Sequence, residues 1–150
     1  MKAKNILSVV VLFLALGLQA QEKYYFSKQL DVSYEEALEK LKGALKEQNF
    51  SVIMEAAMHE TIMSKIPGSK MDPYIILGAC NAKIAHTFIQ AEPNMGLFLP
   101  CKIVVKHVGE NRSEVAVINP EVSMSVTGNA ALAPMLAEVS GQLKEVLSSL

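Results

Sequence analysis

The sequence lacks several features that would narrow its function at once. It has no tryptophan, only two cysteines in 150 residues, and no excess of either charge, with 14 Lys+Arg against 15 Asp+Glu. The missing positive excess argues against nucleic-acid binding, which depends on a basic surface. Glycine-rich nucleotide-binding loops, the G-x-S-x-G nucleophile motif and the H-E-x-x-H zinc motif are absent as well. The sequence therefore favours a small binding protein over an enzyme, and it names no cofactor.

The first twenty residues have the pattern of a secretory signal peptide. Lys2 and Lys4 precede an apolar run over residues 6–18, and Ala20 offers a small residue for cleavage. The rival interpretation is a retained membrane anchor, but the run has 13 residues and a bilayer-spanning helix needs about 20. Residue 21 is Gln21, so a lipoprotein's modified cysteine has no acceptor. We expect cleavage near Ala20-Gln21, a periplasmic or secreted protein, and no stable membrane anchor afterwards.

Cleavage leaves residues 21–150 as one domain, with 12 basic and 15 acidic residues and a formal charge of −3. The local patterns predict strand, helix, strand, short helix, strand, helix, strand, strand and helix in that order. The expected strands cover 23–30, 50–55, 74–80, 102–108 and 113–118. The expected helices cover 34–48, a short segment at 57–65, 82–92 and 129–150. This order predicts an α+β fold with a single, mostly antiparallel sheet and a long C-terminal helix packed on it.

Three local signals carry this prediction. Ser33 and Glu36 form a capping box at the start of the first helix. Residues 109–112 have the composition of a hairpin turn between two strands. After Asn129, apolar residues recur at a three-four spacing up to Leu150, as they do on one face of a helix. This stripe is expected to face the sheet, although a dimer contact would bury it too.

The two cysteines allow three interpretations. Cys80 closes one expected strand and Cys101 opens the next, so the thiols could meet if these strands are neighbours. A disulfide here would close a loop of about 20 residues and contribute roughly 3 kcal/mol. Separate thiols are the second interpretation. The third uses both sulfurs as a redox pair or as ligands of Cu(I) or Zn²⁺, with His86 or Met95 completing the shell.

Two further charged residues are candidates for the same ligand or redox site. Glu55 ends an apolar strand and Lys65 precedes a Pro-Gly loop, so they could pair or line a pocket. The simpler interpretation is that both residues are exposed to solvent because each lies at the end of a secondary-structure element. The candidate site therefore comprises Cys80, Cys101, Glu55, Lys65 and His86, with Cys80, Cys101 and His86 as weak metal candidates and no catalytic residue assigned.

Most of the mature chain, from about Tyr24 to Leu150, resembles the domain-of-unknown-function family 302 (DUF302). The most specific matches are the segment Pro-Tyr-Ile-Ile-Leu-Gly-Ala-Cys-Asn at 73–81, Ala85-His86, Glu92-Pro93, 96–101 and Val104-Val105. Glu55 and Lys65 also match residues of the family. Two positions depart from it, because Ala82 stands where the family often has proline and Ala57 where it often has an acidic residue. A site that depends on that acidic residue would be incomplete here.

The resemblance implies a compact α+β domain that tends to dimerise, and it implies no activity. We therefore carry three hypotheses for function. The first is a homodimeric binding module for a small ligand or soft metal near the cysteines. The second is a thiol-redox or sulfur-handling protein using Cys80 and Cys101. The third is a structural or interaction protein with a disulfide.

Overall fold

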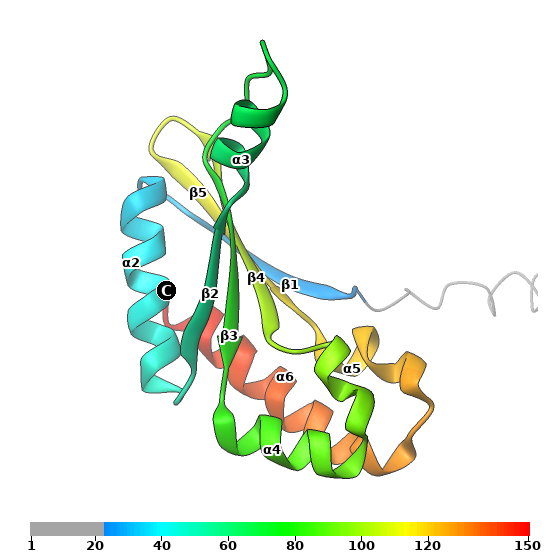
Figure 1. The fold of residues 1–150 in the computed structure, drawn as a ribbon. Coiled ribbons are helices and arrows are strands. Elements are labelled where there is room, and N and C mark those ends of the chain that lie inside the picture. Colours follow the sequence, from blue (N-terminus) through cyan, green and yellow to red (C-terminus); the bar gives the residue numbers. More distant parts are fainter. Residues whose placement is uncertain (1–22) are drawn as a thin grey trace, which may run out of the picture.

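The computed structural model describes residues 23–150 and consists of one five-stranded antiparallel sheet with helices around it (Figure 1). The strand order across the sheet is β1-β5-β4-β3-β2. The strands are β1 (Tyr25–Leu30), β2 (Ser51–Ala57), β3 (Tyr74–Cys80), β4 (Cys101–Gly109) and β5 (Arg112–Ile118). The predicted fold class and the single antiparallel sheet are thus confirmed. The predicted signal peptide lies outside the described residues.

Two long helices cover one face of the sheet. Helix α2 (Tyr34–Glu47) begins at Ser33, whose side chain accepts a hydrogen bond from the Glu36 N–H at 3.2 Å, as the capping box predicts. Helix α6 (Ala133–Ser148) is the long C-terminal helix. Both helices lie on the same side of the sheet in Figure 1. Their buried side chains are Ala37, Leu41, Ala44 and Leu45 from α2, and Leu136, Val139, Ser140, Leu143, Val146 and Leu147 from α6.

The remaining elements lie at the two ends of the sheet. Helix α3 (Met58–Lys65) extends the β2–β3 connection at one end, and α4 (Ala82–Ala91) and α5 (Pro120–Ser123) lie at the other (Figure 1). Short 3₁₀ turns follow them, η1 (Pro93–Leu97), η2 (Ser125–Thr127) and η3 (Ala130–Leu132). Asn129 caps η3 and not the final helix, which begins four residues later than predicted because a 3₁₀ turn precedes it. No helix in this part of the chain is long and apolar enough to cross a membrane.

The alternation of side chains along the strands separates two different faces. The face toward α2 and α6 carries fully buried apolar residues, including Leu77 on β3, Ile103 and Val105 on β4, and Val115 and Val117 on β5. Their neighbours in sequence, such as Val104 and Ala116, point the other way and are only partly buried. The sheet therefore has one face in the core and one face that no long helix covers.

Candidate functional site

The register between β3 and β4 places the two cysteines on opposite faces of the sheet. Ala79 pairs with Cys101, so these two side chains share the face toward the helices. Cys80 is the next residue on its strand and therefore points to the uncovered face. Both thiols are free. The strands β3 and β4 are neighbours, but the two thiols lie on opposite faces of the sheet, which corresponds to the interpretation as separate thiols.

The two thiols also differ in burial. Cys101 is 4% exposed, whereas Cys80 is half-buried. The pKa of the Cys101 thiol is raised to about 11, mainly by burial and in addition by the neighbouring Cys80, while Lys102 and a backbone hydrogen bond oppose the rise. A raised thiol pKa means that the neutral form persists at physiological pH. Cys101 is therefore placed as a core residue and not as a reactive nucleophile.

The difference between the thiols predicts selective alkylation of the folded protein. At pH 8 the thiolate fraction of Cys101 is on the order of 0.1%, because its pKa of about 11 lies well above the pH. Iodoacetamide should modify Cys80 first, and Cys101 at least ~100-fold more slowly, with the Cys101 rate rising as the pH approaches 11. Peptide mass spectrometry of native and urea-unfolded protein measures both rates. Equal alkylation rates of the two thiols in the native protein, or an intact mass showing a disulfide, would contradict the assignment of Cys101 as a buried, unreactive thiol.

The other predicted site residues do not gather around the cysteines. Glu55 forms an ion pair with Lys42 of α2 at 3.0 Å, and its side chain is 46% exposed. Lys65 is exposed in the last turn of α3, and His86 is exposed on α4. Residues 23–150 contain no group of three or more His, Cys, Asp or Glu side chains that could hold a metal ion. The soft-metal interpretation therefore gains no support from the arrangement of these residues.

A polar contact that the sequence did not point to fixes α3 on the sheet. The His59 ring nitrogen Nδ1 accepts a hydrogen bond from the Tyr74 N–H at 3.2 Å. The His59 ring also meets the Tyr34 ring edge-on, with centroids 6.2 Å apart. Burial raises the pKa of Tyr34, and the carboxylates of Glu35, Glu60 and Glu55 raise it further, in that order. This cluster joins α2, α3 and β3 and holds Tyr74 in place at the rim of the uncovered face.

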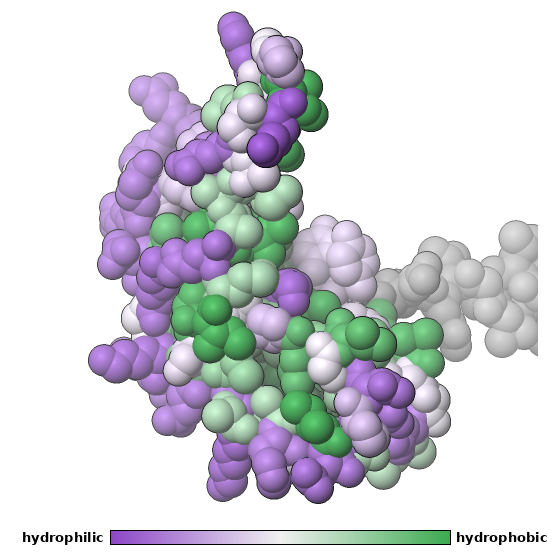
Figure 2. Space-filling model, in the orientation of Figure 1, coloured by the Kyte–Doolittle hydropathy of each residue, from purple (hydrophilic) through white to green (hydrophobic). Residues whose placement is uncertain are grey.

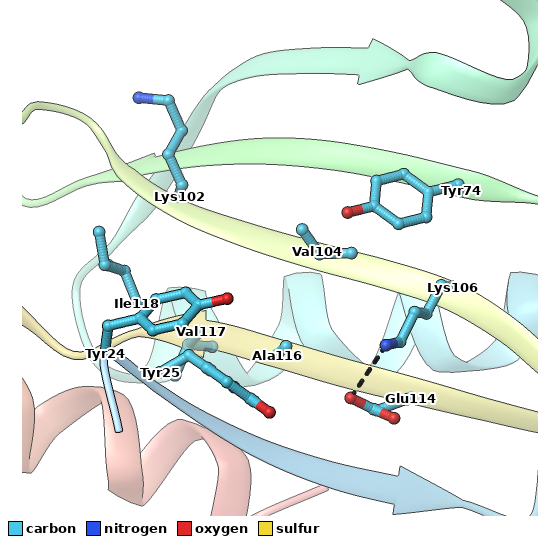
Figure 3. A pocket seen from close by; sticks show the side chains of 10 residues that line it. All are labelled: Tyr24, Tyr25, Tyr74, Lys102, Val104, Lys106, Glu114, Ala116, Val117 and Ile118. Carbon is cyan, nitrogen blue, oxygen red and sulfur yellow. Dashed lines mark ion pairs between the residues drawn. The ribbon is translucent and has the colours of Figure 1, made fainter. Parts of the chain in front are cut away.

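The uncovered face of the sheet contains a hollow of about 370 Å³. It is lined by Tyr24, Tyr25, Tyr74, Lys102, Val104, Lys106, Glu114, Ala116, Val117 and Ile118 (Figure 3). Figure 2 shows the same side of the molecule hollowed between the α3 end and the α4–α5 end, with apolar side chains gathered beside the recess. Residues from three parts of the sheet, namely the start of β1, the start of β3 and the β4–β5 pair, meet at this place.

Side-chain size explains why the face is hollow there. Val104 of β4 pairs with Ala116 of β5, and Ala116 pairs with Ser27 of β1, so small side chains form the floor. Larger side chains stand around this floor. Tyr24 and Tyr74 point their hydroxyl groups inward from opposite sides in Figure 3. A shallow apolar floor between aromatic rings suits a flat ligand better than a bulky one.

The charged groups of the hollow are distributed unevenly. The Lys106 ammonium pairs with a Glu114 carboxylate oxygen at 3.2 Å, and the Glu114 side chain is only 16% exposed. Lys102 stands at the opposite end, beside Ile118 in Figure 3. Its ammonium donates a hydrogen bond to the Pro100 carbonyl oxygen at 2.9 Å. One end of the hollow therefore carries a compensated ion pair, and the other carries a lysine with a neutral partner.

Comparison with known proteins supports the fold. Residues 26–150 match the model of the family described as "Domain of unknown function DUF302". A solved structure described as an uncharacterized conserved DUF302 protein from Bacillus stearothermophilus superposes with a TM-score of 0.79 at 23% sequence identity. This match covers 85% of this chain and 98% of that one. No curated protein matches the sequence. At this identity the structural match supports the fold and says nothing about a ligand.

Proposed function

The chain belongs to the DUF302 family, and we propose that it is a non-enzymatic binding module that holds a small, flat organic molecule in the hollow on the uncovered face of its sheet. This proposal keeps the binding module that the sequence favours but moves the site away from the Cys80–Cys101 pair. The hollow, with its small apolar floor and three tyrosines, is the observation that carries it.

The dimensions of the hollow fit this role. Its volume of about 370 Å³ lies at the lower end of the range of roughly 300–1,000 Å³ that is usual for small-molecule sites. A flat ring lying on Val104 and Ala116 would contact the rings of Tyr24 and Tyr74 at its edges. Such contacts combine apolar burial with aromatic packing, and the tyrosine hydroxyls can still donate hydrogen bonds to polar groups of the ligand.

A neutral fluorescent dye tests the proposal directly. N-Phenyl-1-naphthylamine has a flat naphthalene ring, is uncharged, and fluoresces weakly in water and strongly in apolar surroundings, so the folded protein should enhance its emission. Ala116→Phe fills the floor of the hollow, and we expect it to weaken dye binding about tenfold, which corresponds to roughly 1.4 kcal/mol. Fluorescence titration of the purified protein, processed at its predicted cleavage site, provides the measurement.

A matched substitution on the opposite side of the molecule serves as control. Ala137 is exposed on α6, so Ala137→Phe adds the same ring far from the hollow and should leave dye affinity unchanged. Circular dichroism confirms that both variants fold. Absence of dye binding by the parent protein, or equal affinity in the two variants, would overturn the proposal. Dye binding that disappears as the protein dimerises at high concentration would instead identify a second copy as the occupant.

A further inference from the structure

We infer that the molecule held in the hollow is an organic anion, oriented with its negatively charged group at the Lys102 end. This inference rests on the proposed function and adds the chemical class of the ligand. It follows from the charges at the hollow and from their spacing along β4.

The lining of the hollow carries an uncompensated positive charge. Only three lining residues are charged, namely Lys102, Lys106 and Glu114. The Lys106–Glu114 ion pair cancels two of these charges. Within residues 23–150, Lys102 makes no ion pair, so its positive charge is uncompensated. The hollow thus carries a net positive charge on a protein whose overall formal charge is negative. A local charge opposite to that of the whole molecule favours an anionic partner.

Lys102 has hydrogen-bonding capacity to spare. Its ammonium has three donors, and the Pro100 carbonyl accepts one of them. Two donors remain for a ligand. In Figure 3 the ammonium points away from the floor of the hollow, and the flexible lysine stem would allow it to turn toward a bound ligand. A carboxylate, sulfonate or phosphate oxygen would make the charge-assisted hydrogen bonds that a neutral group makes more weakly.

The spacing of the charged residues along β4 sets the orientation of a bound anion. Lys102 and Lys106 are four residues apart on one strand, so their Cα atoms are separated by roughly 13 Å, with Val104 between them. A ring placed over Val104 is therefore about 7 Å from either lysine backbone. At the Lys106 end the partly buried Glu114 carboxylate would repel an anion. The negative group should consequently face Lys102, and the ring should lie over Val104 and Ala116.

Two dyes with the same aromatic groups separate the charge from the ring. 1-Anilinonaphthalene-8-sulfonate carries a sulfonate, and N-phenyl-1-naphthylamine lacks it. We expect Lys102→Gln to weaken sulfonate-dye binding about fivefold to tenfold and to leave the neutral dye within about twofold. Glu114→Gln should strengthen sulfonate-dye binding, because it removes the repelling carboxylate and frees Lys106. A general loss of structure could not produce these opposite changes.

Lys65→Gln is the matched control, because Lys65 is an exposed lysine at the end of α3 that does not line the hollow. It should change neither affinity. The inference is overturned if both dyes bind but Lys102→Gln leaves their affinity ratio at the parent value, or if Lys65→Gln changes the ratio as much. A different result would overturn the proposed binding function itself: neither dye would bind, or Ala116→Phe would have no effect on binding.

Discussion

Replacing Asn119 by alanine should lower the free energy of unfolding by about 2–4 kcal/mol, because the change leaves the Lys23 carbonyl and the buried Ser140 hydroxyl without this partner. Asn119 is 5% exposed. Its amide donates a hydrogen bond to the Lys23 carbonyl at 3.1 Å, and its side-chain oxygen accepts one from the buried Ser140 hydroxyl at 3.1 Å. Its backbone N–H also donates to the Tyr24 carbonyl at 2.7 Å, and alanine retains this bond. Urea unfolding followed by circular dichroism measures the loss.

Asn129→Ala is the appropriate comparison for this prediction. Asn129 also accepts a backbone hydrogen bond, from the Ala131 N–H at 3.1 Å, but in an exposed turn where water can replace the side chain. Its loss should cost about 1 kcal/mol or less. A double-mutant cycle between Asn119→Ala and Ser140→Ala should show coupling of about 1 kcal/mol. Equal costs for the two asparagines would show that the buried network does not hold β5 and α6 together.

The Asn119 network also affects the proposed site. The Asn119 side-chain amide holds the Lys23 carbonyl, directly before Tyr24 and Tyr25, which line the hollow. Asn119→Ala should therefore weaken binding of the neutral dye even under conditions where the variant is fully folded. A network that is formed by a strand end, a short helix and α6 depends on contacts between distant segments, so no local sequence pattern indicates it.

The fold could be predicted because its signals are local. The capping box at Ser33, the hairpin turn at 109–112 and the three-four spacing of α6 each lie within one element. The start of the final helix was predicted four residues too early, because Asn129 has the same capping role for a 3₁₀ turn as for an α-helix. Helix α5 was missed, since its four residues are too few to show a helical period.

The candidate site could not be predicted in the same way, because it depends on register. The sequence left open whether the strands at Cys80 and Cys101 are neighbours. They are neighbours, but the pairing of Ala79 with Cys101 places Cys80 one residue further along its strand and therefore on the other face. The hollow likewise requires Ala116 to stand beside Val104, which neither strand shows alone. The alternation of Lys102, Val104 and Lys106 was a usable signal, because polar residues at both ends of an outward-facing row are unusual for a core strand.

Gly78 was another available signal, since an isolated glycine within an apolar strand often marks a close approach of backbone or side chain. It lies in β3 between Met54 and Lys102, its paired neighbours on β2 and β4. A Cβ added to Gly78 would overlap the Pro100 ring and would lie 3.1 Å from the Met54 Cβ. The absent side chain therefore lets Pro100 pack on the sheet, and the Pro100 carbonyl in turn holds the Lys102 ammonium.

Gly78→Ala should consequently lower the free energy of unfolding by about 2–3 kcal/mol, since a ring on the backbone must move to accommodate one methyl group. The entropy of the unfolded chain alone predicts a gain in stability, because alanine restricts the unfolded chain more than glycine does. Gly43→Ala in α2 provides the contrast. Its Cβ would have no heavy atom within 4 Å, so it should raise stability by roughly 0.5–1 kcal/mol.

The Gly78→Ala substitution should also change anion binding at the Lys102 end of the hollow. A displaced Pro100 carbonyl would release Lys102, so Gly78→Ala should alter the affinity ratio of the sulfonate dye to the neutral dye, whereas Gly43→Ala should not. Denaturant titrations and dye titrations on the two variants test both effects. A stabilising Gly78→Ala would contradict the packing of Pro100 on the strand. A destabilised variant with the parent ratio would show that Lys102 is held independently of Pro100.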